Sequence, residues 1–191
     1  MIVIGASLGG LKALQIIIRR LPDPLPVPVV VVLHRHKDAT EPLAPILQGE
    51  STWTVSEAVD KEPIRPARIY LAPPDYHLHV ESDHFSLSTD ESVNHARPSI
   101  DVLFESAAEA LGPKVIGVIL TGASSDGARG ASQIKRCGGQ IVVQDPASAE
   151  CRVMPSAAIE STGTAHVKPL DQIAETLIQL TKEIRQSRSL R

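Results

Sequence analysis

Ser7, His34 and Asp126 each lie at or just after the end of an apolar run that is typical of a buried strand. A serine hydroxyl can attack a carbonyl carbon when a histidine takes its proton and an aspartate orients that histidine. An imidazole is mostly neutral at pH 7, because its unperturbed pKa is about 6.5, so it can accept the proton. These residue types predict a Ser–His–Asp catalytic triad with the serine as nucleophile.

The segment Gly5 to Gly9 (GASLG) has the G-x-S-x-G spacing of a nucleophile elbow. Small flanking residues permit the sharp strand-to-helix turn, and the free amides of the next helix would point toward an oxyanion. The same glycines are consistent with close helix–sheet packing or with a phosphate cradle, although the sequence contains neither G-x-G-x-x-G nor G-x-x-x-x-G-K-[ST]. His34 is equally consistent with a polar strand terminator, and Asp126 with the N-cap of the helix that follows it.

The remaining histidines offer weaker candidates. His36 competes with His34 as the base, since the two rings would point the same way from an extended segment. His77 and His79 are assigned to an exposed polar face. Neither the histidines nor Cys137 and Cys151 have the spacing of a zinc site, so we expect no metal and no cofactor. The order serine, histidine, aspartate differs from that of the α/β-hydrolases, which argues against their fold but not against a triad.

The elements that must position these residues alternate between strands and helices. Predicted strands cover 2–6, 29–33, 54–59, 68–72, 115–120, 140–144 and 165–167, and predicted helices cover 9–20, 41–48, 100–111, 126–136, 155–160 and 170–188. Ser99 is expected to cap the third helix. Residues 77–81 and 84–88 alternate in polarity and predict an antiparallel hairpin. We therefore expect an α/β fold: a three-layer, doubly wound, mostly parallel sheet with helices on both faces and a hairpin insertion, its site at the carboxyl ends of the strands.

Length and composition limit the class of protein. The 191 residues fit one domain, 1–191. A net charge of −3 and an aromatic content of 3% provide neither a basic surface nor stacking platforms, so nucleic-acid binding is not expected. No apolar run approaches the roughly 20 residues of a membrane span, and no signal peptide begins the chain, so we expect no membrane insertion. Two cysteines form no disulfide scaffold, which indicates a cytoplasmic protein.

A series of blocks resembles, in order, the catalytic domain of CheB-type chemotaxis receptor methylesterases, the protein-glutamate methylesterases. The blocks are IGASLGG at 4–10, VVVVLH at 29–34, IYLAPPDYHLHV at 69–80, ARPSIDVLFESAA at 96–108, GVILTGASSDGARG at 117–130 and GGQIVVQDPASAECRVMPSAAI at 138–159. The resemblance implies a serine hydrolase that removes methyl groups from glutamyl methyl esters on the methylated cytoplasmic helical domain of chemoreceptors, and that often deamidates receptor glutamines. It assigns the nucleophile to Ser7, the general base to His34 and the aspartate to Asp126.

The same resemblance suggests where an oxyanion would bind and how the enzyme would be controlled. The candidate oxyanion donors are backbone amides of Leu8, Gly122, Ala123 and Ser124. Family enzymes usually carry an N-terminal receiver domain that blocks the cleft until it is phosphorylated. No receiver domain is expected within 1–191, so a separate regulatory protein would have to supply any phosphorelay control.

Parts of the sequence depart from the family pattern. Arg35-His36 stands where Met-Pro is common, Gly122-Ala123-Ser124 where Gly-Met-Gly is common, and Ala96 at the first position of H-R-P-S. These changes fall on the expected cleft walls and leave the triad intact. Two alternatives remain open, namely a non-catalytic signalling scaffold with the same fold and an esterase for another small carboxylic ester.

Overall fold

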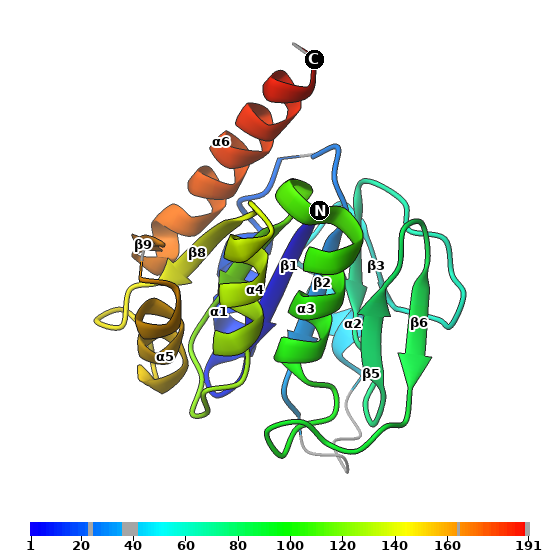
Figure 1. Ribbon diagram of the computed structural model, residues 1–191, viewed down its shortest axis with the longest axis horizontal. Coiled ribbons are helices and arrows are strands. Elements are labelled where there is room, and N and C mark those ends of the chain that lie inside the picture. Colours follow the sequence, from blue (N-terminus) through cyan, green and yellow to red (C-terminus); the bar gives the residue numbers. More distant parts are fainter. Residues whose placement is uncertain (23–24, 36–41, 164, 190–191) are drawn as a thin grey trace.

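The chain forms a seven-stranded sheet in the order β3-β4-β2-β1-β7-β8-β9, and every neighbouring pair is parallel. A computed structural model describes residues 1–22, 25–35, 42–163 and 165–189 (Figure 1). The strands are β1 Ile2–Ala6, β2 Val29–Leu33, β3 Thr54–Glu57, β4 Arg68–Leu71, β7 Ile116–Ile119, β8 Gln140–Gln144 and β9 His166–Lys168. From β1 the chain builds outward first through β2 and later through β7, so the sheet is doubly wound as predicted. Such a change of direction leaves a crevice at the carboxyl ends of the central strands.

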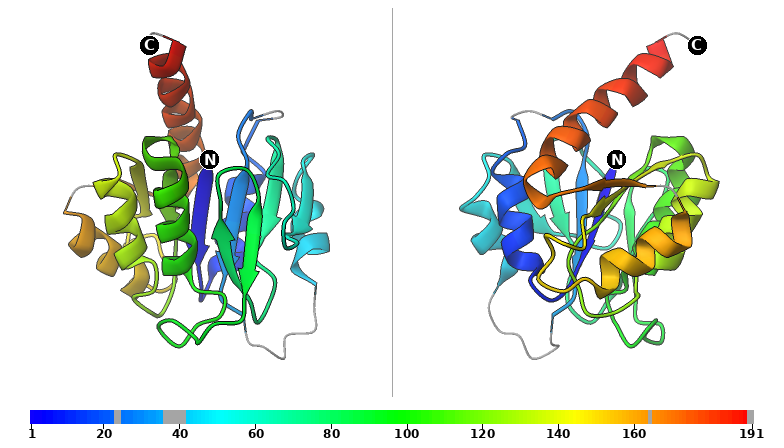
Figure 2. Two further views of the ribbon diagram at one scale, coloured as in Figure 1. Left: turned by 45° about the vertical axis from the view of Figure 1, so that its right-hand side comes forward. Right: turned by 90° about the vertical axis from the view of Figure 1, so that its left-hand side faces the viewer.

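Helices cover both faces of the sheet, as expected (Figures 1 and 2). One face packs against α1 Gly10–Ile18, α2 Leu43–Gln48 and α6 Leu170–Ser189, and the other against α3 Ile100–Leu111, α4 Ala128–Arg136 and α5 Val153–Thr162. Successive side chains of β1 enter different cores, since Ile4 packs on the α1 side and Val3 on the α3 side. This double burial explains why the central strands show no polar alternation. No helix in the described part of the chain is both long and apolar enough to span a bilayer.

The predicted antiparallel hairpin is present as β5 His77–Val80 and β6 Phe85–Ser88, and β5 packs against α3. One expectation about it is wrong, because His77 is only 1% exposed. Its Nδ1 accepts the Ser99 N–H at 3.2 Å and its Nε2 donates to the Glu91 carbonyl at 3.1 Å. The segment leading into α3 therefore covers this residue. Polarity along a strand indicates which residues share a face, but not whether a distant segment covers that face.

Candidate active site

Ser7 and His34 lie beside each other at the carboxyl ends of adjacent strands. Ala6 of β1 is in register with Leu33 of β2, and the His34 N–H donates to the Ala6 carbonyl at 3.0 Å. On its other side, the Ser7 N–H donates to the Thr121 carbonyl at 3.0 Å, just beyond β7. The parallel register therefore brings the predicted nucleophile and base together, although the sequence separates them by a helix and a proline-rich turn.

The turn after Ser7 requires glycine. Gly9, the N-cap of α1, has φ +77, a left-handed conformation that other residues rarely adopt. A Cβ there would also lie 2.8 Å from the Glu150 Cβ. The Gly10 N–H donates to the Ser7 carbonyl at 2.8 Å and closes the turn. The GASLG segment thus forms a sharp strand-to-helix elbow, which is the geometry its spacing predicts.

His34 and Asp126 are joined by a hydrogen bond in which Nε2 donates to Oδ2 at 2.8 Å. Asp126 is fully buried and follows β7 through the 121–127 loop. Because Nε2 binds the carboxylate, Nδ1 is the ring nitrogen that is available to accept a proton. His36, the competing base, lies outside the described residues.

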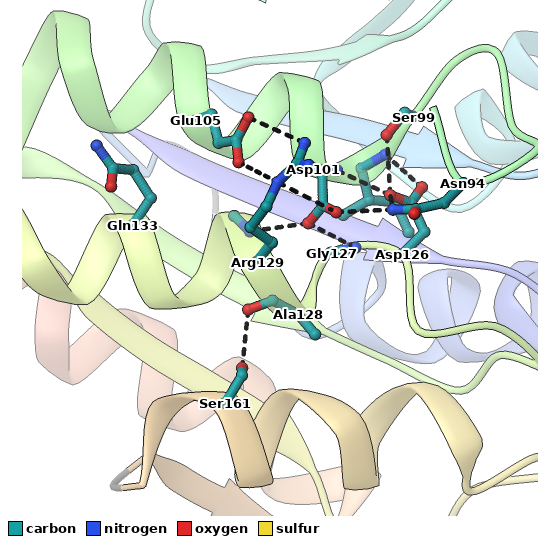
Figure 3. A network of polar contacts seen from close by, with 12 residues as sticks. Asn94, Ser99, Asp101, Glu105, Asp126, Gly127, Ala128, Arg129, Gln133 and Ser161 are labelled. Carbon is teal, nitrogen blue, oxygen red and sulfur yellow. Dashed lines mark hydrogen bonds and ion pairs between the residues drawn. The ribbon is translucent and has the colours of Figure 1, made fainter. Parts of the chain in front are cut away.

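Asp126 caps a helix, but not the helix that follows it. The N-cap of α4 is Gly127, at φ +95. Asp126 instead accepts the first amides of α3, with Ile100 N–H at 2.7 Å and Asp101 N–H at 3.1 Å (Figure 3). Ser99 is the N-cap residue of α3, as expected, but its hydroxyl donates to Asp126 Oδ1 at 2.8 Å and makes no cap hydrogen bond. Asp126 accepts those amides in place of the Ser99 hydroxyl, because the packing of α3 against α4 brings a stronger acceptor to them.

Asp101 caps α4 in return. Its Oδ1 accepts the Gly127 N–H at 2.9 Å and the Gly130 N–H at 2.8 Å. Asp101 in the first turn of α3 therefore caps α4, and Asp126, just before α4, caps α3, so both helix N-termini meet beside His34. An acidic residue in a first turn is a usual sign of capping. Nothing local in the sequence indicates that the capped helix is the neighbouring one, so the capping role of Asp101 cannot be predicted from it.

The two carboxylates differ in their response to this environment. Burial pushes the pKa of Asp126 upward, but hydrogen bonds from His34 and the Ile100 amide outweigh it, and the pKa lies below its ordinary value. Burial raises the pKa of Asp101, and the nearby negative charge of Asp126 raises it further. The hydrogen bond from the Gly130 N–H opposes this rise. Asp126 is thus ionised at neutral pH and suited to orient and stabilise an imidazolium.

The low pKa of Asp126 predicts a specific acid response. In the unfolded chain an aspartate titrates near about 3.9, so its stabilising contribution is complete above about pH 4 and is lost as pH falls through the lower folded-state pKa. Asp126→Asn should therefore be less stable than wild type at neutral pH, and the difference should shrink below about pH 4. Urea unfolding at pH steps measures this difference, and a constant gap across the acid range would contradict the assignment.

The backbone N–H groups that are candidates to bind an oxyanion differ in whether they already make a hydrogen bond. The Gly122 N–H already donates to the Cys151 carbonyl at 3.1 Å. Within the described residues, the amides of Leu8, Ala123 and Ser124 donate to no other group, and Leu8 is 54% exposed. The Ser124 hydroxyl accepts the Asp126 N–H at 3.4 Å. Three of the four candidate amides, all but that of Gly122, are therefore available to bind an oxyanion.

Gly122 has no side chain and so leaves room beside Ser7, the predicted nucleophile. A Cβ at this position would lie 2.6 Å from the Met154 Cε and 3.0 Å from the Ser7 Cβ. We expect Gly122→Ala to displace Ser7 and to lower kcat about tenfold or more, since displacements near 1 Å can cost about a hundredfold. Gly49→Ala is the matched control, because its nearest atom would be 3.6 Å away. Ester-hydrolysis rates of both variants test this, and wild-type kcat for Gly122→Ala would contradict it.

Two hollows adjoin His34. A cavity of about 650 Å³ is lined by the Ser7 elbow and α1, and a second of about 300 Å³ is lined by segments that include Arg35, Ala96 and Arg97. Arg97 donates to Asp75 Oδ1 at 2.7 Å, and Arg35 lies 3.7 Å from Glu57. The described departures from the family pattern at Arg35 and Ala96 thus lie on one wall of the cleft. Among the described residues, no group of three or more His, Cys, Asp or Glu side chains is arranged to hold a metal ion.

Comparisons with known proteins identify the family and the fold that this chain resembles. Residues 2–177 match the sequence model of the family described as CheB methylesterase. The chain is 48% identical over 180 residues to a putative protein-glutamate methylesterase/protein-glutamine glutaminase of Leptospira interrogans, covering 94% of this chain and 93% of that protein. It is 38% identical to the protein-glutamate methylesterase/protein-glutamine glutaminase of Thermotoga maritima, but covers only 53% of it. The crystal structure of the Thermotoga maritima CheB methylesterase catalytic domain superposes with a TM-score of 0.90, covering 94% of this chain and 97% of that one.

Proposed function

Since this chain belongs to the CheB methylesterase family, we propose that it is a serine hydrolase of protein glutamyl methyl esters, with Ser7 as nucleophile, His34 as general base and Asp126 as the orienting acid. The observation that carries the proposal is the 2.8 Å bond from His34 to the buried Asp126, made by a histidine that lies in register beside Ser7. A histidine that merely ended a strand would need no buried carboxylate. The two cores packed on one sheet support a single catalytic domain over 1–191.

The geometry supports acyl transfer in two stages. The Ser7 oxygen attacks the ester carbonyl carbon while His34 Nδ1 takes its proton, and available backbone amides among Leu8, Ala123 and Ser124 bind the oxyanion. The carbon–oxygen bond to methoxide breaks, and the imidazolium returns the proton to form methanol. Water then attacks the glutamyl ester of Ser7 with His34 again as base, which frees the glutamate carboxylate. With a glutamine side chain the leaving group is ammonia, which is the deamidation named for the relatives.

The substrate we assign is the methylated helical domain of chemoreceptors, and the reaction is placed in chemotaxis signalling. The family match and the names of the relatives, which specify protein glutamate and protein glutamine, support this assignment. The cavity that Ser7 lines is open to solvent, and Arg35 and Lys12 are the cationic residues in its lining. A site for a side chain on a protein surface needs such an open approach, whereas a free small ester would be better held in an enclosed pocket.

The decisive experiment is methanol release from methylated receptor membranes, run beside hydrolysis of p-nitrophenyl acetate. Release of methanol, and of ammonia from receptor glutamines, supports the receptor function. Hydrolysis of p-nitrophenyl acetate without methanol release identifies an esterase for another carboxylic ester. A folded protein that hydrolyses neither compound would be the signalling scaffold, and the proposal would be wrong.

A further inference from the structure

Asn94 places one amide group between the two buried carboxylates that join α3 to α4. Its Nδ2 donates to Asp101 Oδ2 at 2.8 Å and to Asp126 Oδ1 at 3.2 Å (Figure 3). An amide –NH₂ group has two hydrogens, so both bonds can form together. No sequence motif marks Asn94, and the acyl-transfer reaction does not use it.

The backbone holds this amide in place. Asn94 and His95 have φ +51 and +61, and Val93 and Ala96 exchange hydrogen bonds of 3.1 and 2.9 Å around them. Two central residues with positive φ define a type I′ turn, and asparagine adopts this conformation more readily than most residues. Arg97, just after the turn, binds the Thr89 carbonyl at 2.9 Å. The turn thus lies against the 89–90 segment and directs the Asn94 side chain inward.

Asn94 bridges two carboxylates, those of Asp101 and Asp126, which carry charge of the same sign when ionised. Asp101 is 2% exposed and Asp126 0%, whereas Asn94 lies at the surface and closes the pair from the solvent side. Arg129 is the cation facing Asp101, with Nε 3.9 Å from its Oδ2, but Glu105 engages the same Nε at 2.6 Å. His34 faces Asp126 from β2. The Asn94 amide therefore adds donors to both carboxylates without adding charge.

The Asn94 bond falls on a particular oxygen of Asp126. His34 and the Ile100 N–H bind Oδ2, whereas Asn94, the Ser99 hydroxyl and the Asp101 N–H bind Oδ1. Donors on Oδ1 fix the rotation of the carboxylate about its Cβ–Cγ bond and so direct Oδ2 at the imidazole. They also stabilise the negative charge of the Asp126 carboxylate. The carboxylate then attracts a proton on His34 less strongly, so His34 is a weaker base.

We propose that Asn94 is a positioning residue of the esterase site, which bridges Asp101 and Asp126, directs the Asp126 carboxylate at His34 and stabilises its charge. The inference rests on the proposed function. It identifies a residue, outside the triad, that sets how efficiently His34 acts as a base and over what range of pH.

Two variants separate orientation from charge. Asn94→Gly keeps the turn, since glycine accepts φ +51, but removes the amide. We expect kcat per active site to fall about fivefold with KM within about twofold, the size of one lost hydrogen bond. Asn94→Asp puts a third carboxylate beside the pair. The added negative charge should let His34 hold its proton to a pH about one unit higher, and the acid limb of the pH–rate profile should shift upward with it.

Lys61→Gly is the matched control. Lys61 also has a positive φ, +62, and lies in an exposed turn between β3 and β4. Its replacement makes the same kind of backbone change without altering the carboxylate pair. We expect the Lys61→Gly variant to keep the wild-type kcat and the wild-type acid limb.

Hydrolysis rates are measured with p-nitrophenyl acetate and are divided by the number of active sites that a fluorophosphonate labels. In a separate measurement, His34 is titrated by NMR of its ring protons. An unchanged His34 midpoint in Asn94→Asp, or wild-type kcat per labelled site in Asn94→Gly, overturns the inference. A purely structural role would lower the melting temperature and the labelled fraction and leave both readouts unchanged. If wild type releases no methanol, the receptor function fails, whereas the NMR midpoint still decides the role of Asn94.

Discussion

Replacing Ser7 with alanine should lower kcat for methanol release by roughly 10⁴- to 10⁶-fold, the range found when a triad nucleophile is removed. The change deletes the attacking oxygen but leaves the bond between His34 and Asp126. Ser7 is partly exposed, so the loss of one oxygen in the elbow should change the free energy of unfolding by no more than about 0.5 kcal/mol. The expected result is an inactive protein with wild-type stability, checked by methanol release and by the melting temperature.

Covalent labelling tests the same assignment without a receptor. A fluorophosphonate should label wild type on Ser7 and should not label Ser7→Ala. Ser82→Ala, in the exposed turn of the β5–β6 hairpin, is the control and should label and hydrolyse like wild type. Equal labelling of Ser7→Ala and wild type would show that Ser7 is not the nucleophile.

Asp126→Asn should lower kcat about 10⁴-fold, as expected for a triad histidine held in the wrong tautomer. An amide has one oxygen, whereas both oxygens of Asp126 accept hydrogen bonds. If the amide nitrogen faces His34, it donates to Nε2 and the ring proton moves to Nδ1. Nδ1 can then no longer accept the proton of Ser7.

The same substitution should also destabilise the fold, because Asp126 caps α3. Buried donors from Ser99 and the first amides of α3 would lose an acceptor, at a cost of about 1–3 kcal/mol. For a chain of this size, each kcal/mol lowers the melting temperature by about 2–4 °C. Asp171→Asn, in the first turn of α6, is the matched control and should retain both activity and melting temperature. A loss of activity no greater than the unfolded fraction would contradict a catalytic role for Asp126.

Much of the scaffold follows from local patterns. The apolar runs at 2–6 and 29–33 became β1 and β2 with the predicted bounds, because a strand buried on both faces needs apolar residues at every position. The parallel order also follows, since helices between strands return the chain to the same end of the sheet. Ser7 and His34 could therefore be placed together from their positions at strand ends.

Other features could not be predicted because their cause is not local. His77 alternates in sequence like an exposed residue, yet the segment before α3 covers it. Ser99 is the N-cap residue of α3, yet the amides that its hydroxyl would cap donate instead to Asp126, a stronger acceptor from another loop. Asn94 lies in a polar segment whose turn geometry only the folded chain reveals.

The amino-acid sequence specified the order of strands and helices and the residues at the strand ends, because both depend on neighbours a few positions apart. The tertiary structure decided what Asp126 does. Its partner amide at Ile100 is 26 residues away, and the two meet only because α3 and α4 pack with their N-termini together. That packing exchanges the caps of the two helices, buries the Asp101–Asp126 pair and brings Asn94 between them. The orientation of the carboxylate on His34 therefore depends on side-chain packing between helices, which no local pattern records.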